Sequence, residues 1–164
     1  MLTNALIRPL LMQYKCVNIF TEDGNYVLDS DGQLESIWSP ADRKDNPGAK
    51  WLVGCDEDDG LYRLISNSNG SFLQKMENEN WVGTMPNSIK DMVADWSNSL
   101  YQWDFKFITT AEGMAEVKIK LVSKTEEAWI NGVKNGGSLN MVELINDGEK
   151  AASVKVMDVG MSSD

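Results

Sequence analysis

Residues 87–103 read NSIKDMVADWSNSLYQW, and this stretch decides the fold class that the sequence predicts. Its apolar residues recur at spacings of three and four, which places them on one face of an α-helix. They are Ile89, Met92, Val93, Trp96, Leu100 and Trp103. Pro86 precedes the segment, and Ser88 with Asp91 is typical of a capping box. We therefore expect a long amphipathic helix here.

Short strands are expected on both sides of this helix, because apolar and polar residues alternate between turns rich in Gly, Asn and Asp. The alternation is clearest in residues 116–122, where Val, Ile and Leu alternate with lysine. The other predicted strands are at about 15–20, 25–28, 34–38, 51–54, 61–65, 71–76, 105–108, 139–145 and 152–159.

A second, short helix is expected at about 125–134. Ser123 or Thr125 can cap it, and Glu126-Glu127 suit the positive end of a helix dipole. The predicted class is therefore α+β, mainly antiparallel sheet with one long and one short helix. A length of 164 residues suggests a single domain, 1–164. The patterns leave open whether 105–164 is a C-terminal extension or subdomain, and no internal repeat is visible.

Charge and composition exclude several functions. The formal net charge is −10, and phosphate backbones would repel such an acidic chain, so we expect no nucleic-acid partner. Histidine is absent, which removes the usual general base and the commonest zinc ligand. No nucleotide-binding or hydrolase motif is present. We therefore predict neither catalytic residues, nor a metal, nor a cofactor, and the chain is not expected to be an enzyme.

The predicted location is the cytoplasm. Cys16 and Cys55 lie in apolar runs without the spacing of a metal or redox motif, so buried free thiols in a reducing compartment are expected. The first twelve residues are interrupted by Arg8 and Pro9 and lack the pattern of a signal peptide. No run approaches the ~20 apolar residues of a membrane span, and a membrane partner is not expected.

Two acidic segments are candidate protein-binding sites. Asp56, Glu57, Asp58 and Asp59 form a turn before Gly60, but the spacing of an EF-hand fails, since Cys55 and Ser66 would stand at its first and last positions. The turn is therefore interpreted as solvated surface or as a contact for a basic partner. The second candidate is Trp81 with Glu77 and Glu79, because an aromatic residue flanked by acids suits an interface anchor.

Residues 50–104 resemble part of the SUKH immunity superfamily. The resemblance follows the order of Trp51-Leu52-Val53-Gly54, the turn Asp56 to Gly60, Leu61-Tyr62-Arg63-Leu64, and the capped helix from Asn87 through Trp96 to Leu100. Members of that superfamily are acidic α+β proteins, and many neutralise a toxin by direct contact. The resemblance implies a non-enzymatic inhibitor of a bacterial toxin.

The predicted function is thus binding and inhibition of another protein, which would carry a basic surface. The alternative is a phage or mobile-element protein, either a virion component or a host-takeover factor. Self-association is open under both hypotheses.

Overall fold

We describe a computed structural model of the chain. The described residues are 14–22, 24, 26–30, 33–37, 46–57, 59–68, 70–76, 81–84, 101–122, 126–133 and 142–159. They contain twelve strands and a 3-10 turn, η1 (Pro47–Ala49). The strands are β1 (Tyr14–Phe20), β2 (Tyr26–Ser30), β3 (Gln33–Ile37), β4 (Trp51–Cys55), β5 (Tyr62–Ser66), β6 (Leu73–Lys75), β7 (Trp81–Thr84), β8 (Trp103–Ala111), β9 (Met114–Leu121), β10 (Trp129–Val133), β11 (Val142–Ile145) and β12 (Val154–Asp158).

Six strands close into a barrel. Following the hydrogen-bonded neighbours leads from β1 to β4, β5, β8, β9 and β12 and then back to β1, with every pairing antiparallel. A closed barrel leaves no unpaired edge along the part of each strand that takes part in the ring.

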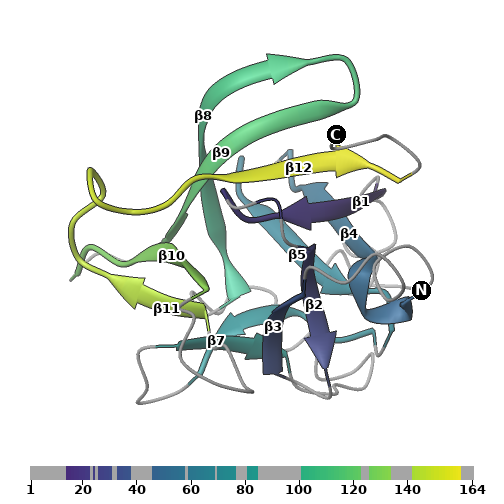
Figure 1. The fold of residues 1–164 in the computed structure, drawn as a ribbon. Helices are drawn as coiled ribbons and strands as arrows, with labels where there is room; N and C mark the ends of the chain where they lie inside the picture. Colours follow the sequence, from purple (N-terminus) through teal and green to yellow (C-terminus); the bar gives the residue numbers. More distant parts are fainter. Residues whose placement is uncertain are drawn as a thin grey trace, which may run out of the picture.

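The other six strands form three hairpins at one end of the barrel: β2–β3, β6–β7 and β10–β11. We call them the hairpin layer. Strand β7 pairs with both β3 and β11, so the layer is continuous, and it lies in the lower half of Figure 1. The β4–β5 and β8–β9 turns lie at the opposite end, which we call the open end.

The order of the strands divides the chain into three units of four: β1–β4, β5–β8 and β9–β12. Each unit gives its first and last strand to the barrel and its middle hairpin to the hairpin layer. This arrangement is a β-trefoil. The three units share their topology but not a visible sequence pattern, which is why the amino-acid sequence alone shows no repeat.

The α+β prediction is wrong. The described residues hold no helix of seven or more residues, and nearly all regular structure is antiparallel strand. The segment 129–133, predicted to be helical, is β10, because Trp129 pairs with both Ile145 and Lys120. Most of the predicted helix at 87–103 lies outside the described residues, but Trp103 begins β8.

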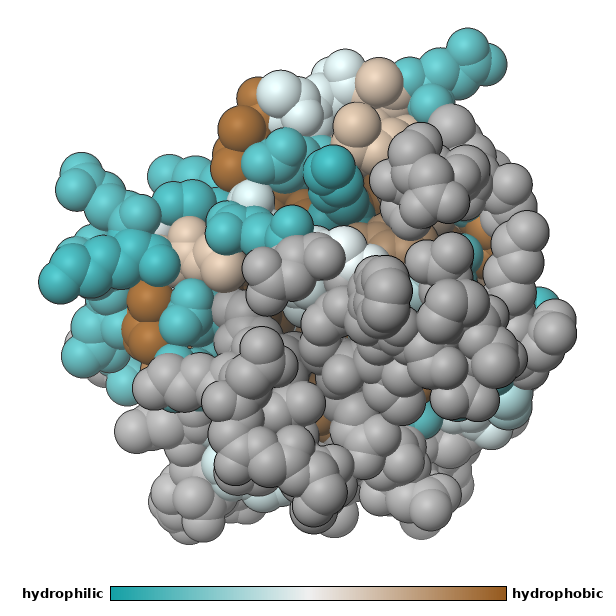
Figure 2. All heavy atoms as spheres, viewed as in Figure 1, coloured by the Kyte–Doolittle hydropathy of each residue, from teal (hydrophilic) through white to brown (hydrophobic). Residues whose placement is uncertain are grey.

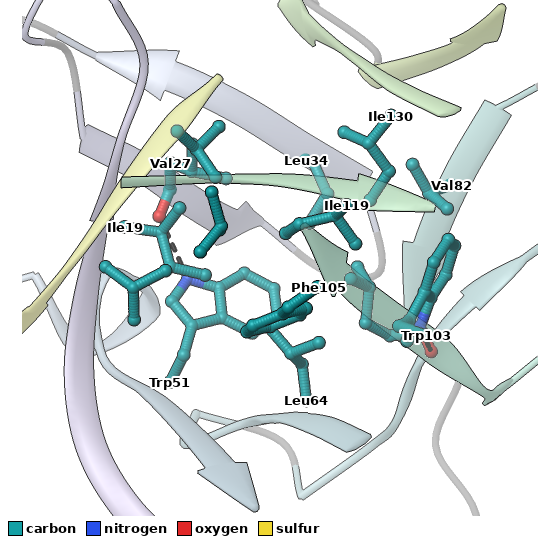
Figure 3. Packing of buried hydrophobic residues seen from close by; sticks show 14 of the residues in the cluster. Ile19, Val27, Leu34, Trp51, Leu64, Val82, Trp103, Phe105, Ile119 and Ile130 are labelled. Atoms are coloured by element: carbon teal, nitrogen blue, oxygen red, sulfur yellow. Dashed lines mark hydrogen bonds between the residues drawn. The ribbon is translucent and has the colours of Figure 1, made fainter. Parts of the chain in front are cut away.

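Two tryptophans fill the barrel (Figure 3). Trp51 begins β4 and Trp103 begins β8, and both side chains are fully buried. Each indole N–H donates to a backbone carbonyl of the hairpin in its own unit: Trp51 Nε1 to Val27 O at 3.0 Å, and Trp103 Nε1 to Leu73 O at 3.1 Å. Both tryptophans therefore belong to the core.

The third unit has a valine, not a tryptophan, at the start of its last strand. Val154 begins β12 and pairs with β9, as Trp51 pairs with β1 and Trp103 with β5. A small cavity of about 30 Å³ lies in the core between the three units, and its wall includes Trp51 of unit 1, Leu64 of unit 2 and Val154 of unit 3. It holds no more than about one water molecule, so it is a packing defect and not a ligand site.

Another buried group ties the first two units together. The Asp29 carboxylate, on β2, accepts hydrogen bonds from Thr84 Oγ1 (2.9 Å) on β7, from Ser66 Oγ at the end of β5, and from Ser68 Oγ (3.3 Å). A buried carboxylate needs such donors to offset its loss of hydration. This cluster therefore holds the hairpin layer to the barrel.

Candidate functional site

A hollow of about 260 Å³ lies where the hairpins of units 2 and 3 meet. Lys75 at the end of β6 lines one side, and Glu126 with Ala128 lines the approach to β10. Leu144 and Ile145 of β11 and the following Asn146 complete it. Units 2 and 3 of the trefoil thus bring together residues that are up to about seventy positions apart in the chain.

The hollow combines hydrogen-bonding groups with apolar surface. The Lys75 ammonium donates and the Glu126 carboxylate accepts, while the Asn146 amide can do both. One donor of Lys75 is aimed at Met76 O, 3.4 Å away. The apolar contribution comes from Ala128, Leu144 and Ile145. Polar groups make up more of the exposed lining than apolar groups, which suits a ligand rich in hydroxyl groups.

Trp129 lies next to the hollow, at the start of β10. Its indole N–H donates to Glu127 Oε2 at 3.0 Å, and Glu127 Oε1 accepts from Lys120 Nζ at 3.0 Å. Lys106 and Lys120 place their Nζ atoms 5.8 Å and 5.6 Å from the ring centroid. The hydrogen bond from Lys120, with that from the indole, lowers the pKa of Glu127 from its ordinary value.

The 147–150 turn packs against this tryptophan. A side chain at Gly148 would come within 2.5 Å of the Trp129 ring, so only glycine permits the contact. Lys118 Nζ donates to Gly148 O at 2.8 Å and to Glu149 O at 3.3 Å, which fastens the turn to β9. Trp129 is consequently buried, although its strand belongs to the hairpin layer and not to the barrel.

The predicted acidic turn lies at the open end, far from the hollow. The Asp59 carboxylate binds the Arg63 guanidinium through two contacts of 3.2 and 3.1 Å and accepts the Leu61 N–H at 2.8 Å. Arg63 is buried. Asp56 is also buried, Glu57 is exposed, and Asp58 lies outside the described residues. The turn thus directs at least Asp59 inward, to a buried cation.

The turn itself follows from local chemistry. Gly60 has a φ of +71°, which favours glycine, and its N–H donates to Asp56 O at 2.7 Å.

Tyr14, at the start of β1, lies near the turn. Burial raises its pKa to about 12, with opposing electrostatic contributions from Arg63, which lowers it, and Asp56, which raises it.

The second predicted site is only partly described. Glu77 and Glu79 lie outside the described residues. Trp81 begins β7, is half-buried, and stands opposite Glu143 of β11. Asn131 Nδ2 donates to Glu143 Oε1 at 3.1 Å. Trp81 is therefore in the hairpin layer, at the other end of the barrel from the acidic turn, so the structure does not bring the two candidates together.

Both cysteines are free thiols, but Cys55 is exposed and Cys16 is half-buried, so the predicted burial is wrong for Cys55. Cys55 ends β4 beside Tyr62. Partial burial and the nearby Asp59 raise the pKa of the Cys55 thiol. A raised pKa keeps the thiol protonated and therefore weakly nucleophilic at neutral pH.

Comparisons with known proteins find solved structures of the same fold but no matching family. No known protein family matches the chain, and no characterised protein matches it in sequence. The resemblance to the SUKH superfamily therefore stays a prediction. No helix in the described part of the chain is long and apolar enough to cross a membrane.

Several solved structures have the same fold. A mosquitocidal holotoxin is 15% identical with a TM-score of 0.65, and the match covers 90% of this chain and 18% of that one. The chain thus spans about a fifth of the toxin's length. The Haemophilus ducreyi cytolethal distending toxin is 12% identical with a TM-score of 0.58, over 100% of this chain and 91% of the toxin chain.

A ricin B-like lectin of Macrolepiota procera, solved in complex with lactose, is also similar. It is 11% identical with a TM-score of 0.55, and the match covers 85% of this chain and 92% of the lectin. At these identities the likeness shows a shared fold. Function has to be argued from the residues of the site.

Sequence patterns did not indicate the hollow. Its polar residues, Lys75, Glu126 and Asn146, come from three separate segments, and no motif links them. Glu126 was instead interpreted as part of a helix start. Only the trefoil topology, which sets β6 and β11 on either side of β7, could have pointed to this place.

Proposed function

We propose that the chain is a non-enzymatic binding module and that the hollow between units 2 and 3 takes one sugar residue of a glycan. The observation that carries the proposal is the set of Lys75, Glu126 and Asn146 around an apolar surface. A sugar offers hydroxyl groups that both donate and accept, together with patches of C–H, and this lining matches both.

The size of the hollow supports a small ligand. Its 260 Å³ falls just below the range of about 300–1,000 Å³ that is usual for drug-sized molecules. The likeness to a lectin solved with lactose makes a carbohydrate the first ligand class to test. The absence of histidine agrees with binding rather than catalysis.

The test is a screen of the purified chain against a glycan array, followed by calorimetry with each sugar that binds. Asn146→Ala and Glu126→Gln should each weaken binding about tenfold or more, since the first removes a hydrogen-bonding side chain and the second replaces a charged acceptor oxygen with a neutral donor. Glu57→Gln is the matched control, because it makes the same chemical change on an exposed residue at the open end. The proposal fails if the array is blank or if the hollow variants bind as well as the parent chain.

Inhibition of another protein is the second hypothesis, and the exposed Glu57 in the acidic turn is the observation that favours it. A basic protein docked there would lose affinity with Glu57→Gln and at high salt, and would be insensitive to Asn146→Ala. An immunity role, a phage role and a location in the cytoplasm remain predictions of the sequence.

A further inference from the structure

Strand β8 is longer than the barrel needs. It has nine residues, and one edge pairs with β9 along the length of the strand. The other edge pairs with β5 only at Trp103, opposite Tyr62. In the described part of the chain the edge from Asp104 to Ala111 therefore has no strand beside it. Figure 1 shows this hairpin rising above the barrel with β8 outermost.

This edge also exposes large apolar side chains. Phe107 is 51% exposed and Ile108 is 50% exposed. Hydrophobic spheres accordingly appear among hydrophilic ones in the upper part of Figure 2, where the hairpin lies. Phe107 touches Tyr62 and Phe105 edge-on, with centroids 6.2 Å apart in both pairs, so its ring is held in place.

The usual protections of an edge strand are weak here. Natural edges carry proline, several charges, a β-bulge or a covering element, because a bare edge pairs readily with another strand. Of these, β8 has a β-bulge at Ile108. Residues 105–111 read FKFITTA, with one charge and no proline. In a chain of net charge −10, residues 105–111 of this edge thus carry no acidic side chain.

We propose that this edge pairs in antiparallel fashion with the same edge of a second copy, with the twofold axis at Phe107. Ile108 is the extra residue of a β-bulge, since the register with β9 shifts between Phe107 and Thr109. With the bulge skipped, Lys106 faces Thr109 of the second copy, and Asp104 faces Ala111. No like charges meet in this register.

Neighbouring registers are poorer. An axis at Lys106 sets two lysines directly opposite each other, which destabilises a strand pair. An axis at Thr109 leaves the two Phe107 rings apart, each opposite a threonine. The axis at Phe107 brings both exposed rings together and removes them from water, and the aromatic contact adds to that burial.

The test is sedimentation of the full chain over protein concentrations up to ~1 mM, a range that detects weak dimers. We expect a concentration-dependent dimer that tightens as salt is raised, because salt screens the repulsion between two acidic copies. A complex with a basic partner would respond to salt in the opposite direction. A wild-type chain that stays monomeric over this range overturns the proposal.

Charge variants at the axis make the test specific. Phe107→Lys and Phe107→Glu should each weaken self-association about tenfold or more, since like charges then meet on the axis. An equimolar mixture of the two should restore a dimer that contains one copy of each. Val159→Lys, a change at the third exposed large hydrophobic residue, is the control and should dimerise as the wild type does.

Self-association of Phe107→Lys at wild-type strength, or failure of the mixture to form the mixed dimer while both variants remain folded, would overturn this pairing. The proposal is independent of the hollow, which lies in the hairpin layer, and glycan binding should persist in all three variants.

Discussion

The tryptophans of the barrel and the tryptophan beside the hollow are buried to similar extents but in different chemical surroundings. Trp51 and Trp103 are enclosed by aliphatic side chains and donate to neutral backbone carbonyls. Trp129 is enclosed by two lysines, a glycine turn and a carboxylate to which it donates.

The difference separates a structural role from one that suits a binding surface. Neutral hydrogen bonds from Trp51 and Trp103 fix the hairpins of units 1 and 2 to the barrel, beside the buried Asp29 cluster. Unit 3 has Val154 in the corresponding place, and its hairpin is instead fastened from outside by charged groups. Unit 3 is also the unit that supplies most of the hollow.

The largest effect is expected from removing a barrel tryptophan. Trp51→Ala and Trp103→Ala should each lower the free energy of unfolding by about 3–5 kcal/mol, because a large cavity replaces a fully buried ring. Chemical denaturation followed by circular dichroism measures this. A loss below ~1 kcal/mol in either variant would mean that the barrel core is not built as described.

A smaller change isolates the hydrogen bond. Trp51→Phe leaves the Val27 carbonyl without its donor in the core, which should cost about 1–3 kcal/mol. Trp129→Phe removes a bond to Glu127, whose side chain is 59% exposed, so water can replace the indole and the loss of stability should be much smaller than in Trp51→Phe. Equal losses in the two variants would remove the distinction between the two environments.

Filling the small core cavity from Val154 of unit 3 should have a modest stabilising effect. Val154→Ile adds one methylene beside a cavity of about 30 Å³. At roughly 24 cal/mol for each Å³, complete filling is worth about 0.7 kcal/mol. A higher midpoint of thermal unfolding would check this. A destabilised variant would show that the added atoms meet the wall of the cavity instead of its space.

The smallest effect concerns pH. Glu127 has a lowered pKa in the folded chain, so its interactions are present at neutral pH and are lost only as the pH falls through that lowered value. The indole N–H resonance of Trp129 should therefore shift with a midpoint below the ordinary pKa of glutamate. The titration should vanish in Glu127→Gln, and its persistence there would assign it to another group.

The strands were largely predictable from the sequence, whereas the topology was not. Alternation of apolar and polar residues located β9 and most of the other strands, because period two is a local property. The helix prediction at 125–134 was wrong for the same reason: the cap-like Ser and Thr and the acidic pair are local helix signals. Trp129 nevertheless pairs with residues of two other strands, and such tertiary pairing overrides local propensity.

The site was the least predictable part. Asp59 was singled out as an acidic surface residue, but its partner Arg63 becomes visible only once the β4–β5 turn is folded. Lys75 and Asn146 carry no signal of their own, since a single lysine and a single asparagine are ordinary surface residues. Their meeting depends on the pairing of β7 with both β6 and β11.

The central claim, that unit 3 and its junction with unit 2 form the binding surface, is tested most directly by NMR. The labelled chain would be titrated with lactose and with each sugar that binds on the array, and the amide shifts mapped on the structure. The account predicts that the largest shifts fall on Lys75, Glu126 and Asn146, with the 56–60 turn unchanged. Shifts centred on the open end, or none with any sugar, would contradict it.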